Sequence, residues 1–570
     1  VRKMSGGLYL EFKPANCKDC YRCLRSCPVK AIEVATHQAT IIEDRCILCG
    51  KCTLVCHQNA KVVHSGRAEV EKLLEGGNVI ASVAPSFVSS LGINNFEVLR
   101  NGLMQMGFAD AEETARGAAA VVECFKQDLE GGKYRNYITS CCPAVNRLIQ
   151  LYYPDALKYL SPVVSPMVAH GTMLKREHPD ARVVFIGPCI AKKREAAESG
   201  VIDGVLTFEE TLEMMRDKCV TLGAENIEQG EDGLRARYFP IPRGVIKSFD
   251  KLPEGYEYLS VDGVERCKEV LENIEDMDGV FIEMNACEYA CINGPCAIRN
   301  KGGAIKANEA VRGYAGSGGC KVPSFNGEEL EGMRHIHKRL RASGFDVSEE
   351  RLLKIMAKTG RDKPENQLNC GACGYDSCRQ KAWAVANGFA DISMCLPYMR
   401  QRAESLSYEI IQNSPNGILV LDGDMRVLQM NNAAKKMFGI TQSDPKGMLL
   451  VDFADPSEYI AAYEAKTGFN RKCEFVKKTG RYVEVNAVVL KEHNVLFALY
   501  KDITDEKQYE GKLHQLTSET LATTDEVIMK QMRVAQEIAS LLGETTAETK
   551  VALLKLKSML KREEDGGDVT

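Results

Sequence analysis

The sequence predicts a multidomain chain built around a central α/β domain with parallel sheets. At 570 residues the chain is longer than one hydrophobic core usually supports. Between about residues 75 and 345, short apolar runs bounded by Gly or Pro alternate with helical segments, a pattern typical of buried parallel strands. All of the 23 cysteines except Cys473 lie before residue 400. We therefore expect cysteine-rich domains on both sides of the α/β domain, followed by a cysteine-poor α+β domain and helices.

The composition indicates a redox protein of a reducing compartment. A net charge of −5 with 26% charged residues disfavours a nucleic-acid-binding surface. No run of about 18 apolar residues is present, and the first residues lead into no long apolar run, so we expect neither a membrane segment nor a signal peptide. So many cysteines in such a chain predict metal ligation rather than disulfides. We expect a cytoplasmic location.

Residues 1–68 contain two cysteine runs with the same C-x2-C-x2-C-x3-C spacing. Pro28 closes the first run, whereas His57 stands at that position in the second. This is the spacing of bacterial two-cluster ferredoxins, in which the fourth cysteine of each run ligates the other 4Fe-4S cluster. A pair of zinc knuckles is the alternative, but those rarely carry two such runs. The predicted ligands are Cys17, Cys20, Cys23 and Cys56 for one cluster and Cys46, Cys49, Cys52 and Cys27 for the other.

Residues 75–345 place further cysteines directly after predicted strands. The runs 78–83, 182–186 and 278–283 indicate strands. Sites in α/β folds form where loops leave the carboxyl ends of strands, and Cys189 and Cys287 follow two of these runs closely. Thiolates from separate loops can converge on one large iron–sulfur assembly; the candidates are Cys142, Cys189, Cys287 and Cys291.

The segments around these cysteines carry a family resemblance. They are Thr139-Ser140-Cys141-Cys142-Pro143, the P-C-x-x-K-x-x-E segment 188–195, and the segment that starts at Glu283. In this order they resemble the three signature segments of the iron-only (FeFe) hydrogenases, and the resemblance covers roughly residues 1 to 345. It implies that the four candidate cysteines ligate the 4Fe-4S part of an H-cluster. It also implies that Cys291 bridges to the two-iron subcluster, which carries CO and CN ligands.

The same resemblance implies roles for residues that bind no iron. Lys192 would hydrogen-bond one cyanide ligand, since an ammonium suits an anionic acceptor, and the turn Ala84-Pro85-Ser86 would approach the other. Cys141 matches a cysteine that delivers protons. Glu195 and Glu283 look like carboxylates that position these segments. Without the cysteines beside them, Lys192 and Glu195 would be an ordinary i, i+3 pair on a helix.

Departures from the family predict slow catalysis. Catalytic members relay protons through two glutamates after an A-D-L turn, and an ungapped alignment places Arg116 and Ala119 at those positions. A thiol such as Cys141 is a reasonable shuttle because its ordinary pKa is near 8.5 and movable, but no evident carboxylate chain lies behind it. Changes such as Gly187 and Asn285 alter the outer shell, which tunes potential and access, and remove no ligand.

Residues 346–402 contain a third cysteine pattern, C-x2-C-x4-C-x16-C. Cys373-Gly374-Tyr375 lies at its core and Cys395-Leu396-Pro397 at its end. The pattern resembles the small 4Fe-4S domain of Rnf-type electron-transport subunits and corrinoid iron–sulfur proteins. The resemblance implies a third accessory 4Fe-4S cluster, and a structural zinc site is the alternative. The predicted ligands are Cys370, Cys373, Cys378 and Cys395.

The remaining residues predict a signalling module. Residues 405–505 open with a strand–turn–strand–helix pattern and close with alternating strands at 482–488 and 496–503, which resembles a PAS domain. No residue there indicates a haem or flavin ligand. In the segment 506–570, Val527, Val534 and Leu541 recur every seven residues, as in a dimeric helix pair. We therefore expect a homodimer.

These parts together lead to one expected function and two alternatives. The leading hypothesis is a sensory FeFe hydrogenase with slow reversible H2 oxidation and proton reduction. Its electrons would pass through three 4Fe-4S clusters to ferredoxin or another redox partner, and PAS would signal its redox state to an unknown downstream protein. One alternative is a catalytic ferredoxin-linked hydrogenase. The other is a hydrogenase-like iron–sulfur protein that carries cubane clusters only and lacks hydrogenase activity.

Overall fold

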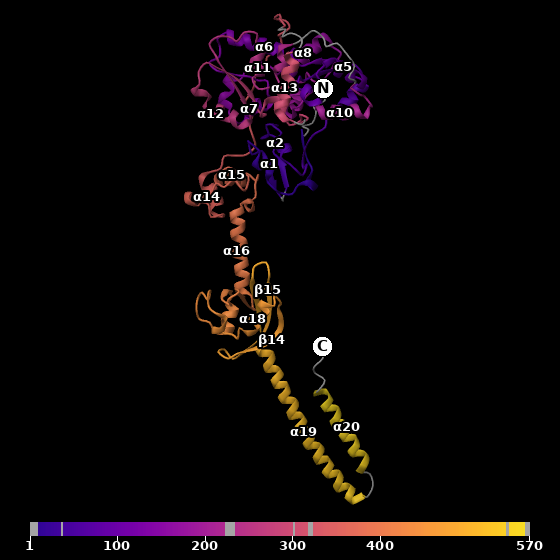
Figure 1. Cartoon of the computed structure of the whole chain (residues 1–570), viewed down its shortest axis with the longest axis vertical. Helices are drawn as coiled ribbons and strands as arrows, with labels where there is room; N and C mark the ends of the chain where they lie inside the picture. Colours follow the sequence, from indigo (N-terminus) through magenta and orange to yellow (C-terminus); the bar gives the residue numbers. More distant parts are fainter. Residues whose placement is uncertain are drawn as a thin grey trace. The chain divides into compact units, whose positions relative to one another are not determined.

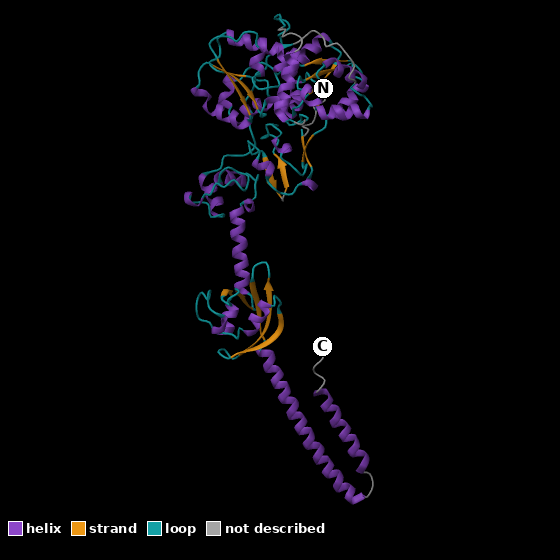
Figure 2. Ribbon diagram, in the orientation of Figure 1, coloured by secondary structure: helices purple, strands orange, loops and turns teal. Residues whose placement is uncertain are grey.

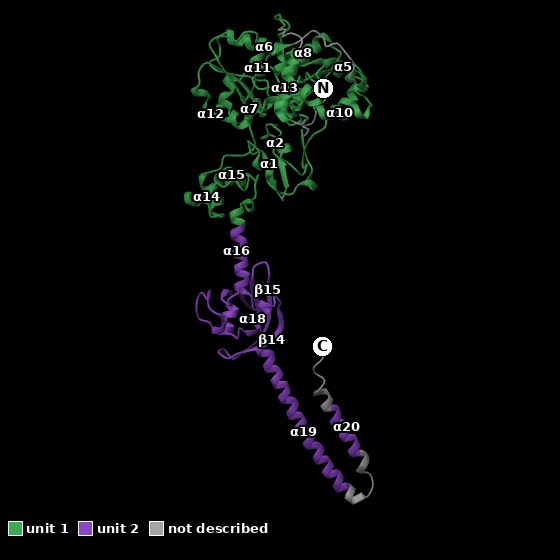
Figure 3. Ribbon diagram, viewed as in Figure 1, with its two compact units in different colours: residues 1–399 green, residues 400–570 purple. Residues whose placement is uncertain are grey.

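The computed structural model of the chain contains two compact units, residues 1–399 and residues 400–570 (Figure 3). The structure describes residues 9–35, 38–222, 234–299, 302–316, 323–542 and 546–564. The first unit holds every predicted cluster cysteine. The second holds the predicted PAS domain and the C-terminal helices.

The N-terminal cysteine-rich domain has two halves of similar shape. Strands β1 (Leu10–Phe12) and β4 (Lys61–Val63) pair antiparallel, as do β2 (Ile32–Ala35) and β3 (Gln38–Ile41). Each cysteine run bends through two left-handed residues and then forms one short helix, α1 (Arg22–Arg25) or α2 (Lys51–Leu54). The left-handed residues are Asp19 and Tyr21 in the first run and Leu48 and Gly50 in the second. Because residues other than glycine seldom adopt this conformation, the repeat reflects one loop shape used twice.

The central domain contains two parallel sheets (Figure 2). The strand order is β6-β5-β8-β9 in one sheet and β10-β11-β7 in the other. The bounds are β5 (Val79–Val83), β6 (Asp110–Glu113), β7 (Tyr137–Ile138), β8 (Arg182–Ile186), β9 (Gly204–Leu206), β10 (Glu257–Asp262) and β11 (Val280–Asn285). β5 and β11 are buried along their whole length, which explains their continuous apolar sequence. The strands expected at 78–83, 182–186 and 278–283 are confirmed.

Helices cover both sheets and supply the apolar faces of their cores (Figure 1). They are α3 (Arg67–Glu75), α4 (Phe87–Leu91), α5 (Phe96–Met106), α6 (Ala115–Glu130), α7 (Pro143–Tyr152), α8 (Pro166–Glu177), α9 (Ile190–Ser199), α10 (Phe208–Asp217), α11 (Gly244–Ser248), α12 (Val264–Asn273) and α13 (Gly303–Gly316). Several of them begin directly after a strand and a short loop. This βα arrangement brings the loops with the signature cysteines to the carboxyl ends of the strands.

The second cysteine-rich domain is small and packs on the N-terminal one. It consists of α14 (Glu349–Ala357), α15 (Cys378–Ala386) and the start of α16 (Leu396–Asn413). The Val34 N–H donates a hydrogen bond to the Phe389 carbonyl (2.9 Å), and the Arg45 guanidinium lies 4.9 Å from the centre of the Trp383 ring. A shared core thus joins two domains that are separated by the whole α/β domain in sequence.

The second unit folds as an antiparallel sheet flanked by helices. The strand order β13-β12-β16-β15-β14 comprises β12 (Gly417–Leu421), β13 (Val427–Met430), β14 (Phe469–Val476), β15 (Arg481–Leu490) and β16 (Val495–Asp502). Helices α17 (Asn432–Phe438) and α18 (Ser457–Glu464) pack against its core, which includes Phe438, Tyr459 and Tyr500. The strands predicted at 482–488 and 496–503 are confirmed.

Two helices follow the sheet and fold back as a hairpin (Figure 1). α19 (Thr504–Leu542) and α20 (Thr546–Glu564) are joined by an ion pair between Lys557 and Asp525 (3.3 Å). Val527 and Val534 of the predicted heptad stripe are exposed, and the side chain of Leu541 lies outside the described residues. Within the described ranges, no helix has the length and hydropathy needed to cross a membrane.

Candidate metal centre

Four signature cysteines lie at the ends of strands from both sheets. Cys142 follows β7 and is the N-cap of α7, and Cys189 follows β8 and is the N-cap of α9. Cys287 follows β11, and Cys291 lies in a short 3-10 helix, Ala290–Asn293. The N–H of Cys296 donates to the Pro188 carbonyl (3.1 Å), which joins the last loop to the Cys189 loop. The thiols of Cys142 and Cys291, which are 149 residues apart in sequence, are thereby brought to the same part of the domain.

Electrostatic coupling among these thiols shows that they are neighbours. Burial raises the pKa of the Cys287 thiol well above its usual value, and the thiolates of Cys189, Cys142 and Cys291 raise it further. Burial also raises the pKa of Cys189 to about 11, with Cys142 as the next cause. Thiolates crowded together without water are unfavourable by themselves. A cationic iron group is the natural partner for such a set.

Lys192 and Glu195 form a partly buried ion pair beside this cysteine set. The Lys192 Nζ donates to Glu195 (2.7 Å) and lies 3.4 Å from the Cys141 carbonyl. Burial lowers the pKa of Lys192, but Glu195 and the thiolates of Cys189 and Cys141 together outweigh burial, and the net shift is upward. Glu195 also accepts a hydrogen bond from the Ser165 hydroxyl (2.8 Å). The ammonium is therefore retained in the interior at the base of the Thr139–Pro143 segment.

The turn Ala84-Pro85-Ser86 offers a second donor at the site. Ala84 donates its N–H to the Ile186 carbonyl (2.9 Å) at the end of β8, and a Cβ added at Gly187 would lie 3.3 Å from the Ala84 Cβ. The turn is thus adjacent to the Cys189 loop. The Ser86 hydroxyl is buried and makes no hydrogen bond with any described residue. Buried hydroxyls without a partner are rare, so this donor fits a bound polar ligand.

Glu283 makes a structural contact with the start of α11. Its carboxylate accepts hydrogen bonds from the N–H groups of Gly244 and Ile246, both at 3.1 Å, at the start of α11. Burial raises the pKa of Glu283 to about 7, although the backbone N–H donors favour the ionised carboxylate and lower its pKa. The carboxylate holds α11 against β11, which agrees with the expected positioning role.

The predicted relay positions contain no carboxylate. Arg116 pairs with Glu112 (3.2 Å) and Glu177 (2.7 Å) at the start of α6, and Ala119 is buried one turn later. The neighbouring Glu113 is buried and bonded to the Arg237 Nε (3.0 Å). The acids near this stretch are therefore engaged in ion pairs with arginines.

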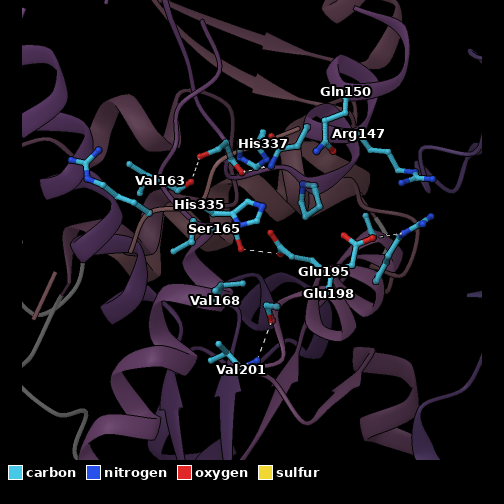
Figure 4. Close-up of a pocket in the computed structure, with 18 of the residues that line it drawn as sticks. Arg147, Gln150, Val163, Ser165, Val168, Glu195, Glu198, Val201, His335 and His337 are labelled. Atoms are coloured by element: carbon cyan, nitrogen blue, oxygen red, sulfur yellow. Dashed lines mark hydrogen bonds and ion pairs between the residues drawn. The ribbon is translucent and has the colours of Figure 1, made fainter. Parts of the chain in front are cut away.

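A cavity of about 290 Å³ is lined by Glu195, the partner of Lys192 (Figure 4). Ser165 and Glu195 meet at its wall, and His335 also lines it. Ser140, next to Cys141, is a further lining residue. The cavity thus extends from Glu195 to the residue beside Cys141 and can hold several water molecules, each of which occupies about 30 Å³ in the liquid.

The N-terminal cysteines lie close to one another, and their division into two ligand groups stays a prediction. Burial raises the pKa of Cys52, and the thiolates of Cys49, Cys46, Cys27 and Cys23 raise it further; the thiolates of Cys23, Cys52, Cys17 and Cys56 act on Lys61. Backbone N–H groups point at the sulfur atoms: Ala31 to Cys27 (3.2 Å), Leu48 to Cys46 (3.4 Å) and Ala60 to Cys56 (3.3 Å). Such donors favour thiolates, so both groups suit iron–sulfur clusters.

A loop of the N-terminal domain packs directly on the central cysteine set. Gly50 has φ of +73°, and an added Cβ would lie 2.3 Å from the Pro295 Cβ and 2.9 Å from the Ile190 Cδ1. Only glycine allows this approach. The Arg147 Nε of α7 also donates to the Cys46 carbonyl (2.7 Å). Sequence reasoning missed Gly50, Arg147 and Ser165, since nothing local shows what a loop glycine, a helical arginine or a serine contacts.

The last cysteine group lines one small cavity. Cys370, Cys373, Cys378 and Cys395 surround a space of about 30 Å³. The four thiols therefore lie around one common space.

Comparison with known families finds matches for four segments of the chain, none of which includes Cys287 or Cys291. Residues 16–60 match the 4Fe-4S dicluster domain, and residues 77–254 match the iron only hydrogenase large subunit, C-terminal domain. Residues 366–397 match an Fe-S cluster family, and residues 407–502 match the PAS fold. The predicted order of domains is confirmed.

Individual proteins are similar to parts of the chain. The periplasmic Fe hydrogenase large subunit of Nitratidesulfovibrio vulgaris is 27% identical over 323 residues, which cover 47% of this chain and 76% of the relative. Iron hydrogenase 1 of Clostridium pasteurianum is 26% identical over 418 residues, 57% of this chain and 71% of the relative. A solved FeFe hydrogenase, HydA1 from Chlamydomonas reinhardtii, is 16% identical and aligns over 48% of this chain and 92% of that chain with a TM-score of 0.34.

Proposed function

We propose that this chain, which carries an iron-only hydrogenase large-subunit domain together with iron–sulfur and PAS domains, is a sensory FeFe hydrogenase. One observation carries the proposal: the partly buried Lys192 ammonium lies beside the four-cysteine set and is held there by Glu195. A plain cubane has no cyanide ligand to accept such a hydrogen bond. This contact therefore favours an H-cluster with cyanide ligands over the alternative of cubanes only.

The residues of the chain take separate roles around that group. An H-cluster, when bound, supplies the reversible cleavage of H2 into two protons and two electrons. The thiolates of Cys142, Cys189, Cys287 and Cys291 would hold it. Lys192 would donate toward one cyanide and Ser86 toward the other, because the Lys192 ammonium lies beside the cysteine set and the buried Ser86 hydroxyl has no hydrogen-bond partner among the described residues. Cys141 and Glu195 handle protons, with Glu195 in contact with the water-accessible cavity.

Slow turnover follows from the engaged arginine at the relay position. Arg116 is held by Glu112 and Glu177 and carries no exchangeable acid proton at neutral pH. Protons must then pass through Cys141, Glu195 and the cavity. Loss of a positioned acid or base typically costs about 10²–10⁴-fold in rate. A slow site suits a sensor, because its redox state follows ambient hydrogen without consuming it.

Two further features support signalling. Exposed apolar side chains on α16 recur at heptad spacing, as in a helix pair between two copies of the chain; they are Met399, Leu406 and Ile410. We therefore propose a homodimer. Cys20 is exposed, so the first cluster is accessible to ferredoxin or another redox partner. The many free cysteines favour the cytoplasm, where thiols stay reduced.

The second candidate is a working ferredoxin-linked hydrogenase whose PAS domain only docks a partner. The intact cysteine set and Cys141 are compatible with it. The two candidates differ in rate, because the working enzyme needs a proton route that the Arg116 and Ala119 positions do not offer.

Infrared spectroscopy of matured protein tests the proposal, together with assays of hydrogen oxidation and evolution. We expect iron-bound CO and CN stretches and measurable but weak turnover in both directions. If no such bands appear after complete maturation, the hydrogenase assignment is wrong. Turnover as high as that of fast catalytic hydrogenases would instead favour the working enzyme.

A further inference from the structure

The second cysteine-rich domain contacts the N-terminal domain through residues 372–376, in addition to the contacts of Val34 with Phe389 and of Arg45 with Trp383. Gly374 has φ of +94°, and an added Cβ would lie 2.8 Å from the Leu24 Cγ. Lys30 forms an ion pair with Asp376 (2.9 Å). The Arg25 guanidinium contacts the Ala372 carbonyl (3.4 Å) and the Cys20 carbonyl (3.0 Å). Residues 372–376 thus lie against residues 24–30, the stretch that contains Cys27.

Tyr375 lies in the core that the two cysteine-rich domains share. Its side chain is 2% exposed and belongs to one core with Leu24 and Cys27, while Cys373 packs against the same core. The Tyr375 hydroxyl makes no hydrogen bond with any described residue. A buried aromatic ring is therefore part of the core that also includes a ligand of each of two predicted clusters.

The other side of the Cys27 group faces the central site. Cys27 is predicted to belong with Cys46, Cys49 and Cys52, and Gly50 of that loop packs on Pro295 and Ile190. The central cysteines, the Cys27 group and the Cys370–Cys395 group are therefore consecutive neighbours in space. The group with Cys17 and the exposed Cys20 is a separate neighbour of Cys27.

The last cysteine leads directly into α16. The Cys395 carbonyl accepts a hydrogen bond from the Met399 N–H (2.9 Å), which makes Cys395 the residue that caps the helix. No residue of α16 is buried. A helix with so little packing depends more than others on charge at its ends, and negative charge at the N-terminus stabilises it.

We infer that residues 24–30 and 372–376 form a redox branch, through which electrons from the central site reach the Cys370–Cys395 group and alter α16 at its first turn. The inference rests on the proposed function and adds which cluster reports to the second unit. The group with Cys20 would serve external partners on the other branch.

The two electrons released from each H2 molecule go to two different clusters. Oxidation of H2 releases two protons to water and two electrons. One electron reduces the 4Fe-4S cluster at Cys370–Cys395 from the 2+ to the 1+ state, and the other reduces an N-terminal cluster in the same way. The added negative charge lies at the N-terminus of α16.

A charge swap at the contact tests the branch. Lys30→Glu faces Asp376 with a like charge and separates the two segments, and Lys30→Glu combined with Asp376→Lys restores an ion pair. Arg379→Glu is the matched control, because Arg379 pairs with Glu349 inside the second cysteine-rich domain. Matured full-length protein is mixed with H2 and frozen at intervals, and electron paramagnetic resonance follows each reduced cluster. Dithionite reduction and iron content show that all clusters are present.

We expect H2 to reduce the Cys370–Cys395 cluster in the unmodified protein. Its reduction should be about tenfold slower in Lys30→Glu, equivalent to about 1.4 kcal/mol, and normal in the swapped pair and the control. Amide hydrogen exchange in the first turn of α16 should slow about two- to fivefold on reduction. If H2 reduces the N-terminal clusters but not this one, or if the swap restores nothing, the branch is wrong and the proposed function stands. If dithionite reduces every cluster and H2 reduces none, the proposed function fails and the branch fails with it.

Discussion

The central cysteine set and the Cys370–Cys395 group are built in opposite ways. The central set takes its thiols from loops after β7, β8 and β11, which belong to two different sheets. The Cys370–Cys395 group takes all four from one stretch of 26 residues that wraps a single small cavity. The first site therefore exists only when a whole domain has folded, whereas the second needs little more than its own loop.

Burial follows the same division. The central thiols are all partly buried and raise one another's pKa, while one thiol of the other group, that of Cys370, is exposed. A charge in the central set must be compensated inside the protein, which explains Lys192 and its partner Glu195 there. At the surface group, water can share that task. The four predictions below would break or sharpen this contrast, and they run from the largest expected effect to the smallest.

The largest effect is expected from loss of one central ligand. Cys287→Ala should abolish H-cluster binding, because each thiolate occupies one corner and no spare cysteine has the same spacing; Cys142→Ala and Cys189→Ala should do the same. The N-terminal clusters and the Cys370–Cys395 cluster should remain, since their ligands are independent. Iron content and the infrared CO and CN bands measure both results. Full H-cluster bands in any of these variants would refute the ligand assignment.

A smaller effect is expected at Cys141, which lies in the same segment but binds no iron. Cys141→Ala should leave the H-cluster infrared bands in place and reduce hydrogen turnover by about 10²–10⁴-fold, because the proton carrier is lost. Cys124→Ala is the control, since Cys124 is a buried thiol of α6 that belongs to none of the predicted ligand groups. Equal turnover in both variants would show that proton transfer to the site does not depend on Cys141.

Glu283 should make the stability of the central domain depend on pH. Burial raises the folded pKa of Glu283 to about 7 from an ordinary 4.5. The folded protein therefore binds a proton that the unfolded chain has released, so stability is greatest below about pH 4.5 and falls as pH rises through 7. We expect a loss of about 2–3 kcal/mol between pH 5 and 8 from this group, at 1.36 kcal/mol for each pKa unit.

Urea unfolding of Glu283→Gln at the two pH values measures this contribution. The variant should lose most of that slope, and Glu288→Gln, which replaces an exposed carboxylate, should keep it. An unchanged slope in Glu283→Gln would mean that Glu283 is ionised in the folded protein.

The smallest effect on catalysis is expected from the surface group. Cys370→Ala should remove only the third accessory cluster, because its ligands are local. Hydrogen oxidation with an artificial dye should stay unchanged, since the N-terminal clusters still carry electrons outward. Iron analysis should show the loss of one cluster, whereas iron content equal to that of the unmodified protein would indicate zinc or an empty site.

The sequence by itself determined the order of the domains and the local cysteine patterns. The two C-x2-C-x2-C-x3-C runs and the Cys370–Cys395 pattern lie on single loops, so residue spacing alone indicates what they can wrap. The buried strands β5, β8 and β11 were predictable because strands covered on both faces are continuously apolar. The strands of the second unit were predictable from their alternation.

Only the tertiary structure decided which of these elements meet. The contact of Gly50 with Pro295, the placement of Tyr375 in one core with Cys27, and the cavity lined by Glu195 join segments far apart in the chain. Local sequence indicates the secondary-structure propensity of a segment and the period of its apolar residues. A contact between distant segments depends instead on how whole domains pack. A glycine or tyrosine in a loop therefore reveals its function only when the surface opposite it is known.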